Sequence, residues 1–448
     1  MDYGAVSLLP TALVLILAIW SHRTLESVIA GSIFAFIIMD GWQFASRLAE
    51  VTTAVLADET SAWVVLVCGL YGSFIGLLVK GGGSYAFGEM LTRRLHGKRS
   101  SLFATWVLGL VIFLDDYLNS LTVGATMKSV TDRFRTSREM LAYVVDSTAA
   151  PMCLLIPISS WGVYFASLLE KNGIAEKGEG ISVFIDAIPY MFYPILAVII
   201  VPLVIAGVVP LMGKMKAAEH RAETTGDLGI FEDSALTVEP SDRANMSVFF
   251  VPIAALLFFT VVPEVDLLRG VILGILVTLA QYAAMRIMPA TELFDTCVDG
   301  LKSMVPVLTM LLALFVFVEA NAAIGLTDYV IAAVQPYMTP VLLPVLIFIT
   351  MSAVSYTTGS NWGVIAIAMP VAFPLAQALE VDILLVVGAL LSASGFGSHA
   401  CFYSDSTVLS AQGAGCRTYD HAITQLPYAV LGAVGAAIIY LIAAIMMV

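Results

Sequence analysis

Two identical tripeptides place a carboxylate beside hydroxyl groups in apolar surroundings. Asp-Ser-Thr occurs at 146–148 within "LAYVVDSTAAPM" and again at 405–407 within "CFYSDSTVLSAQGAG". An ionised carboxylate at bilayer depth costs about 2.5 to 3.5 kcal/mol even on insertion scales, so such residues usually face the protein interior or a water-filled path. Carboxylates, hydroxyls, amide oxygens and backbone carbonyls are the hard oxygen ligands that suit a small alkali cation. The two tripeptides therefore predict a buried site for a cation such as Na+.

The composition predicts a membrane protein around these tripeptides. Of the 448 residues, 59% are hydrophobic and 12% are charged, whereas soluble domains have about 25% charged residues. We therefore expect an all-α polytopic membrane protein whose main partner is the lipid bilayer, and neither an enzyme nor a nucleic-acid-binding protein. The five cysteines have no CxxC or metal-ligand spacing, so they are interpreted as small buried residues. No cofactor is expected other than Na+ as a transported or coupling ion.

The basic residues orient the predicted spans, because short loops rich in Lys and Arg stay cytoplasmic. Two such segments, 80–100 and 128–138, flank the apolar window 101–127. A simple crossing would leave one basic segment outside, so we predict a re-entrant hairpin that turns at the polar run "LDDYLNSLTVG". The apolar window 338–379 is interrupted by "VSYTTGSNWGV" and has no Lys or Arg. It is predicted to be a second hairpin that opens to the outside.

The two halves of the chain are predicted to be inverted repeats, each with a re-entrant helical hairpin and a broken transmembrane helix. With both termini outside, all but four of the 21 Lys and Arg lie inside. Repeats of this kind are typical of secondary transporters, which bind their substrate at the bilayer midplane. The predicted units are, in chain order, an N-terminal transmembrane helix at 1–23, repeat 1 at 24–212 with its hairpin at 101–127 and its broken helix at 139–168, a cytoplasmic loop and linking helix at 213–264, and repeat 2 at 265–448 with its hairpin at 338–379 and its broken helix at 381–412.

The hairpin tips and the broken helices supply the candidate site residues. The aspartates have no Lys or Arg near them in the sequence, which favours a functional role, whereas individual Ser and Thr residues equally well tighten helix packing or cap half-helices. The candidate ligands for an ion or substrate are Asp115, Asp116, Asn119, Ser120, Thr122, Asp146, Ser147, Thr148, Thr358, Ser360, Asn361, Ser404, Asp405, Ser406 and Thr407. The predicted Na+ ligands among them are Asp146, Asn119, Asn361 and Asp405. Adjacent residues on a helix diverge by about 100°, so only one of Asp115 and Asp116 is expected to face the site.

A histidine and several aromatic residues near these motifs have two interpretations each. His399 is a candidate for a proton relay because the pKa of histidine lies near neutral, and a packing histidine held by hydrogen bonds is equally compatible with the sequence. Trp161, Trp362 and Phe396 either pack the interface between domains or wall a cavity for an amine or amino acid through cation–π contacts. The simplest exchange mechanism is one carboxylate that holds either a proton or a sodium ion, but not both.

The motifs resemble a known family. The stretch "FLDDYLNSLTVGATMKSVTDRFRTSREMLAYVVDSTAAP", with "YTTGSNWG" and "SDSTVLSAQGAG" in the second half, is similar to the NhaC-type sodium/proton antiporter family of the ion transporter superfamily. The resemblance implies two inverted repeats, an elevator-like moving domain, a homodimer and a prokaryotic inner membrane. It implies functional roles for Asp115, Asp116, Asn119, Asp146, Ser147 and Thr148, and for Thr358, Ser360, Asn361, Asp405, Ser406 and Thr407.

Three functions remain open from the sequence. Sodium/proton antiport is favoured because an organic anion site normally recruits Arg or Lys, and the predicted core has none between Lys302 and Arg417. The alternative is Na+- or H+-coupled transport or exchange of a small organic solute, namely an amino acid, an amine or a carboxylate. A channel or membrane scaffold without coupling is disfavoured by the two broken helices.

Overall fold

The protein is helical and spans a membrane several times. The computed structural model describes residues 3–21, 23–83, 86, 90, 94–113, 116–157, 159–231, 245–262, 266–359 and 361–447, and these residues form helices and connecting segments without a strand. Five of the described helices are long and apolar enough to cross a membrane, or seven if each of two bent helix pairs is one span. The predicted class, an all-helical multi-pass membrane protein, is thereby confirmed.

The chain order of the helices is the frame for the site. The first half has α1 Leu9–Ser21, α2 Thr24–Asp40, α3 Phe44–Ala57, α4 Glu59–Lys80, α6 Lys98–Val111, α7 Asp116–Arg133, α8 Arg138–Ser147, α9 Ala150–Leu155, α10 Ser160–Lys171, α11 Gly180–Ala187, α12 Phe192–Ala206 and α13 Gly213–Thr225. The second half has α14 Ser247–Val261, α15 Leu267–Met285, α16 Ala290–Ser303, α17 Val305–Ile324, α18 Leu326–Val334, α19 Leu343–Thr358, α20 Trp362–Ala378, α21 Ile383–Ala400, α22 Asp405–Ala414 and α23 Thr418–Met447. Short 3-10 segments lie at Gly4–Leu8, Gly41–Gln43, Ile188–Tyr190 and Gln335–Tyr337.

Each apolar window that the sequence marks as a hairpin or a broken helix contains more than one helix. Window 101–127 contains most of α6 and α7, and window 338–379 contains α19 and α20. The breaks have local causes. Gly359 ends α19 with a φ of 71°, a backbone conformation that favours glycine. Ser404 begins α22, where its hydroxyl oxygen accepts from the backbone N–H of Thr407 at 3.3 Å, as is common at helix N-termini.

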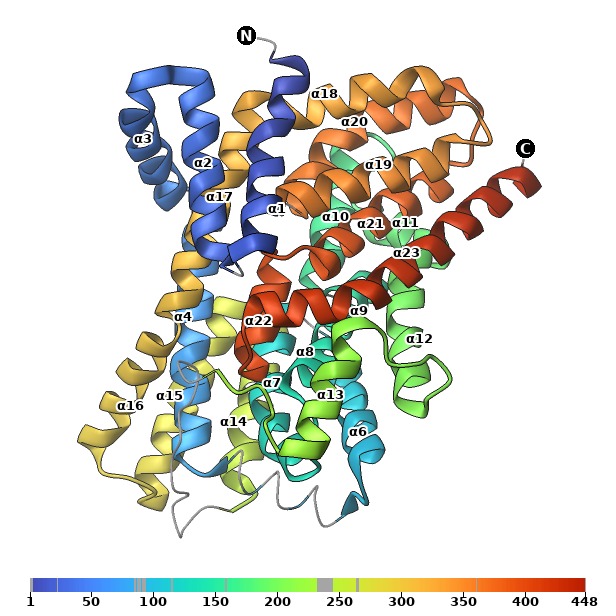
Figure 1. The fold of residues 1–448 in the computed structure, drawn as a ribbon. Coiled ribbons are helices and arrows are strands. Elements are labelled where there is room, and N and C mark those ends of the chain that lie inside the picture. The colour runs from blue at the N-terminus through green and yellow to red at the C-terminus, as the bar shows by residue number, and fades with distance from the viewer. Residues whose placement is uncertain are drawn as a thin grey trace.

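The helices form two groups that stand side by side (Figure 1). We call α2, α3, α4 and α14–α17 the α4 group, and α6–α12 with α19–α23 the α21 group. In the α4 group, α4 and α16 approach so closely that a Cβ on Gly300 would lie 2.3 Å from the carbonyl oxygen of Gly72. In the α21 group, α19 packs along α21, and α12 along α23. The two groups meet where α4 contacts α7 and where α17 contacts α22.

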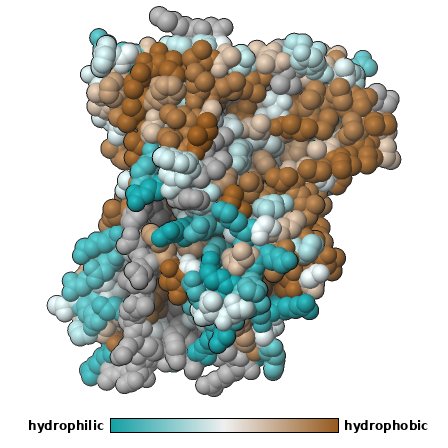
Figure 2. All heavy atoms as spheres, viewed as in Figure 1, coloured by the Kyte–Doolittle hydropathy of each residue, from teal (hydrophilic) through white to brown (hydrophobic). Residues whose placement is uncertain are grey.

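Helix α13, which follows α12, fixes the start of α8. Figure 2 shows hydrophilic residues gathered over the lower part of the molecule, where α13 lies, and apolar residues over the upper part. The buried carboxylate of Glu219 accepts from the backbone N–H of Ser137 at 2.9 Å and pairs with Lys98. Arg221 donates to both carboxylate oxygens of Glu139, at 2.8 and 3.0 Å. Because α8 has its first residues bound in this way, the carboxylate near its other end has a defined position.

Candidate functional site

Asp146 is fully buried near the C-terminal end of α8 and contacts two helices from the other half of the chain. Its Oδ1 accepts from the hydroxyl of Ser406 at 2.5 Å. Its Oδ2 accepts from the side-chain amide of Gln425 at 2.7 Å and lies 3.0 Å from Nε2 of His421. We call these four residues the Asp146 cluster. Helix α22 supplies one of its hydrogen-bond partners and α23 supplies the other two.

Asp405, the aspartate of the second tripeptide, is the first residue of α22 and has different partners. The hydroxyl of Tyr117 donates to its Oδ2 at 2.7 Å. The side-chain amide of Asn361 and the backbone N–H of Ser406 donate to its Oδ1, at 3.1 and 2.8 Å. We call these residues the Asp405 cluster. They join the first turn of α7, the break between α19 and α20, and the start of α22.

Ser406 belongs to both clusters. Its backbone N–H donates to Asp405 and its hydroxyl donates to Asp146. One residue at the start of α22 therefore connects the two buried carboxylates. The aspartates of the two tripeptides, which lie 259 positions apart in the sequence, come together at the centre of the α21 group.

Asn119 lies where the first hairpin window meets the first broken helix. Its side-chain NH2 group donates to the carbonyl oxygens of Gly109, Ile112 and Thr148, at 2.7, 2.8 and 2.9 Å. Its Oδ1 is buried and accepts no hydrogen bond from the residues that the structure describes. Buried amide oxygens are normally paired, so this oxygen is available to a cation.

His399 is bound through both of its ring nitrogens. Nε2 lies 2.9 Å from the hydroxyl of Ser147, and Nδ1 lies 2.7 Å from the hydroxyl of Tyr193. Ser147 uses its own proton on the carbonyl oxygen of Tyr143 at 2.7 Å, so Nε2 carries a hydrogen that Ser147 accepts, and Nδ1 accepts from Tyr193. This network ends on the residue next to Asp146, and Gln425 also donates to the His399 carbonyl oxygen. His399 is therefore a neighbour of the Asp146 cluster.

Asp116 and Ser120 of α7 have partners outside the two clusters. The indole N–H of Trp161 donates to Oδ1 of Asp116 at 2.9 Å, and both side chains are buried. Ser120 shares a hydrogen bond of 2.9 Å with Ser410 of α22. Next to that bond the two backbones touch, because a Cβ on Gly413 would lie 2.2 Å from the Ser120 carbonyl oxygen, and one on Gly124 would lie 2.5 Å from the Gly413 carbonyl carbon.

The remaining predicted residues have local partners or lie outside the described part of the chain. Thr148 and Thr358 donate to carbonyl oxygens of their own helices, and Ser404 donates to the hydroxyl of Thr407 at 2.9 Å. The hydroxyl of Thr122 is buried without a described partner, and the ring of Phe396 packs against Tyr193. Asp115, Ser360 and the side chain of Trp362 lie outside the described residues.

The sequence analysis missed His421 and Gln425. Both are buried and both reach Asp146 from α23. The predicted last span began after His421, so these residues were not considered together. The available signal was their spacing in "TYDHAITQLP", because residues four apart lie on the same face of a helix. Two polar side chains on one face at the start of a long apolar helix indicate a polar partner inside the protein.

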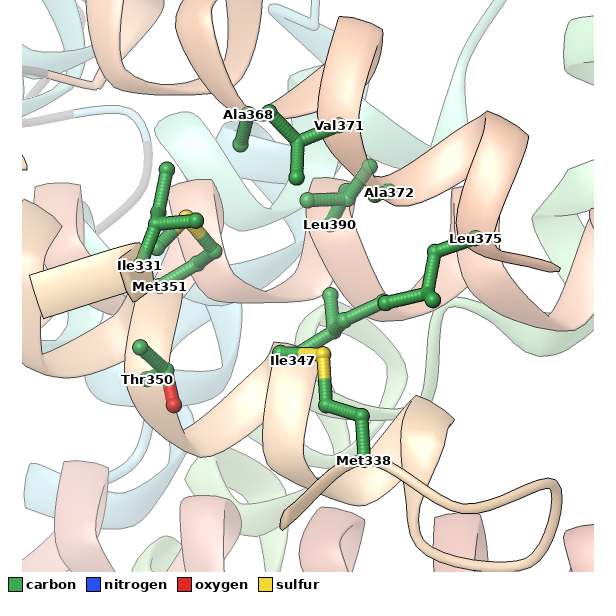
Figure 3. A pocket seen from close by; sticks show the side chains of 10 residues that line it. All are labelled: Ile331, Met338, Ile347, Thr350, Met351, Ala368, Val371, Ala372, Leu375 and Leu390. Carbon is green, nitrogen blue, oxygen red and sulfur yellow. The ribbon is translucent and has the colours of Figure 1, made fainter. Parts of the chain in front are cut away.

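An apolar cavity in the second half lies apart from both clusters. It encloses about 330 Å³ and is lined by ten residues of α18–α21 and the segment between α18 and α19 (Figure 3). Thr350 is the one polar residue in this lining, and no member of the two clusters belongs to it. A cavity without charged or amide groups does not suit an ion, so the carboxylate clusters remain the candidate site.

Comparisons with known proteins agree with the motifs. The model of the Na+/H+ antiporter family matches residues 152–445. An uncharacterized protein of Haemophilus influenzae is 31% identical over 468 aligned positions, which cover 97% of this chain and 90% of that protein. The crystal structure of the YdaH transporter of Alcanivorax borkumensis aligns with a TM-score of 0.37 and 14% identity, over 90% of this chain and 88% of that chain. By the family match and the identity to its relative, the chain belongs to the Na+/H+ antiporter family and is a secondary transporter rather than an enzyme.

Proposed function

We propose that the protein exchanges Na+ for protons at the carboxylate of Asp146. The observation that carries this proposal is the set of partners of Asp146. The carboxylate is fully buried, and among the described residues it pairs with no Lys or Arg but with a hydroxyl, an amide and an imidazole. A buried carboxylate without a permanent counter-charge requires either a proton or a metal cation. This alternation is the chemistry of an antiporter.

The position of Asp146 in its helix supports a cation at this carboxylate. Asp146 lies one residue before the end of α8. The C-terminal end of a helix carries a partial negative charge, which stabilises cations and destabilises anions. Oxygen atoms of Ser406 and Asn119 are further candidate ligands, together with backbone carbonyls at the break after α8. Hard oxygen ligands of this kind favour Na+.

We also propose that the two halves are inverted repeats and that the α21 group moves past the α4 group. The order α2, α3, α4, then α6 with α7, then α8, has its counterpart in α15, α16, α17, then α19 with α20, then α21. The close packing within each group, and the smaller contact between them through α4 with α7 and α17 with α22, support an elevator-like motion. The two re-entrant hairpins, the homodimer, the inner membrane and the outside position of both termini remain predictions.

Reconstituted protein tests the exchange reaction. Proteoliposomes loaded at acid pH are expected to become more alkaline inside when Na+ is added outside, and a pH-sensitive dye in the lumen reports this change. Protein-free liposomes are the control for passive leakage. Lack of Na+-driven proton movement by correctly folded protein would disprove the proposal.

Coupled transport of an amine or amino acid is the second candidate, and the contact between Asp116 and Trp161 favours it. A buried carboxylate beside an indole ring combines a counter-ion with an aromatic surface, and both bind ammonium groups. Uptake of labelled amino acids, amines and carboxylates into the same proteoliposomes tests it. Na+-driven uptake of one of these solutes without proton exchange would replace the first proposal by this one.

A further inference from the structure

The side-chain amide of Gln425 lies between two oxygen atoms from different parts of the chain. Its Nε2 donates to Oδ2 of Asp146 at 2.7 Å and also to the carbonyl oxygen of His399 at the C-terminal end of α21. The side chain is buried, with 1% of its surface exposed. Gln425 therefore connects the ends of α8 and α21 from a third helix, α23.

Hydrogen-bond chemistry fixes the orientation of this amide. An NH2 group has two hydrogens and faces two acceptors here, whereas the opposite orientation would place Oε1 against a carboxylate and a carbonyl oxygen. Oε1 is buried and accepts no hydrogen bond from the described residues, which shows that the contacts of the NH2 group determine the orientation. The amide hydrogens thus bring partial positive charge between two oxygen atoms, as a bound cation would.

We propose that Gln425 is a specificity-determining residue whose amide competes with Na+ for Asp146. This inference rests on the proposed function. A cation that binds Oδ2 of Asp146 and the His399 carbonyl together must displace the amide of Gln425. Because a hydrogen bond to a charged group is stronger than one between neutral groups, the displacement weakens Na+ binding and speeds Na+ release. The residue thus limits affinity in favour of turnover.

The test compares Gln425→Met with Thr424→Val in the full-length protein. Methionine has nearly the shape of glutamine but no donor. Thr424 is the adjacent residue, is also buried, and uses its hydroxyl on the carbonyl oxygens of Asp420 and His421, both at 2.8 Å, so its replacement does not touch Asp146. Na+-driven exchange is measured at alkaline pH, where few protons compete, with Na+-dependent thermal stabilisation as a direct measure of binding.

We expect Gln425→Met to lower the half-saturating Na+ concentration about tenfold, because the competing hydrogen bond to the carboxylate is removed. The maximal rate should fall, whereas Thr424→Val should leave both values unchanged. Gln425→Glu should also lower the half-saturating concentration, because it replaces the donor by an oxygen ligand, and it serves if the methionine variant does not fold.

A half-saturating concentration that is unchanged or raised in the folded Gln425 variants would overturn the inference. It would show that Gln425 only orients the carboxylate, and the exchange reaction would stand. If the unmodified protein shows neither Na+-driven exchange nor stabilisation by Na+, the proposed function itself fails. A purely structural role for Gln425 does not predict tighter Na+ binding together with slower turnover.

Discussion

The two Asp-Ser-Thr tripeptides have the same residues but lie at opposite ends of their helices. Asp146 lies one residue before the C-terminus of α8, whereas Asp405 is the first residue of α22. The N-terminal end of a helix stabilises an anion and the C-terminal end destabilises it. Helix α22 therefore stabilises the charge of Asp405, whereas Asp146 depends on side chains from elsewhere.

Their partners differ in the same sense. Asp405 receives hydrogen bonds from a phenol, an amide and a backbone N–H, and these donors connect α7, the break before α20, and α22. Asp146 has an imidazole among its partners. The comparison teaches that the position of a helix break relative to a motif decides what the motif does. We infer that Asp146 carries the exchange and that Asp405 holds the broken segments together.

The largest expected difference is in transport. Asp146→Asn should abolish Na+-driven proton flux, because an amide neither releases a proton nor balances the charge of a cation. Asp405→Asn should keep measurable flux, since its oxygen still accepts from Tyr117. Both variants are compared in the proteoliposome assay after size-exclusion chromatography has confirmed folding. The opposite pattern, with flux retained only in Asp146→Asn, would reverse the two assignments.

A smaller effect is expected from Tyr117→Phe, which removes a donor from a buried carboxylate. The loss of a hydrogen bond to a charged group should lower the free energy of unfolding by about 1.5 to 3 kcal/mol. Thermal unfolding in detergent measures this change as a lower Tm. Tyr440→Phe is the matched control, because its hydroxyl contacts a carbonyl oxygen and the hydroxyl of Ser392, so a smaller loss is expected. Equal losses would contradict a special role of the Asp405 cluster.

The smallest effect is expected from Ser120→Ala on the side of α7 that faces α22. Its hydroxyl pairs with the hydroxyl of Ser410, and a hydrogen bond between neutral groups contributes about 0.5 to 1.5 kcal/mol. The same thermal assay should show a small decrease in Tm with normal Na+ exchange. Loss of exchange in this variant would extend the ion site along α7 and weaken the division between the two aspartates.

The sequence predicted the membrane class, the family and the pairing of the two tripeptides, because apolar composition and repeated polar motifs are local signals. It identified Asn119, Asn361 and the two aspartates as candidate ligands, and the structure places these residues at neighbouring breaks. Their role as Na+ ligands stays a prediction.

The partners of each aspartate were not predictable in the same way. His421 and Gln425 lie more than 270 positions from Asp146 in the sequence, and nothing in the local pattern around either residue indicates the contact. The unequal chemistry of the two tripeptides was also missed. It depends on whether a helix ends or begins at the motif, and the boundaries of helices are the least certain part of a sequence-based prediction.

The contact between Gly124 and Gly413 has a practical consequence for studies of motion. Because the backbones of α7 and α22 touch there, the two helices have no space in which to approach each other further, and we expect their separation to stay constant during turnover. A pair of spin labels at the outer ends of α7 and α22 would then serve as an internal ruler. Distances from α4 to either label, measured against that ruler, would separate true displacement of the helices from disorder of the labels.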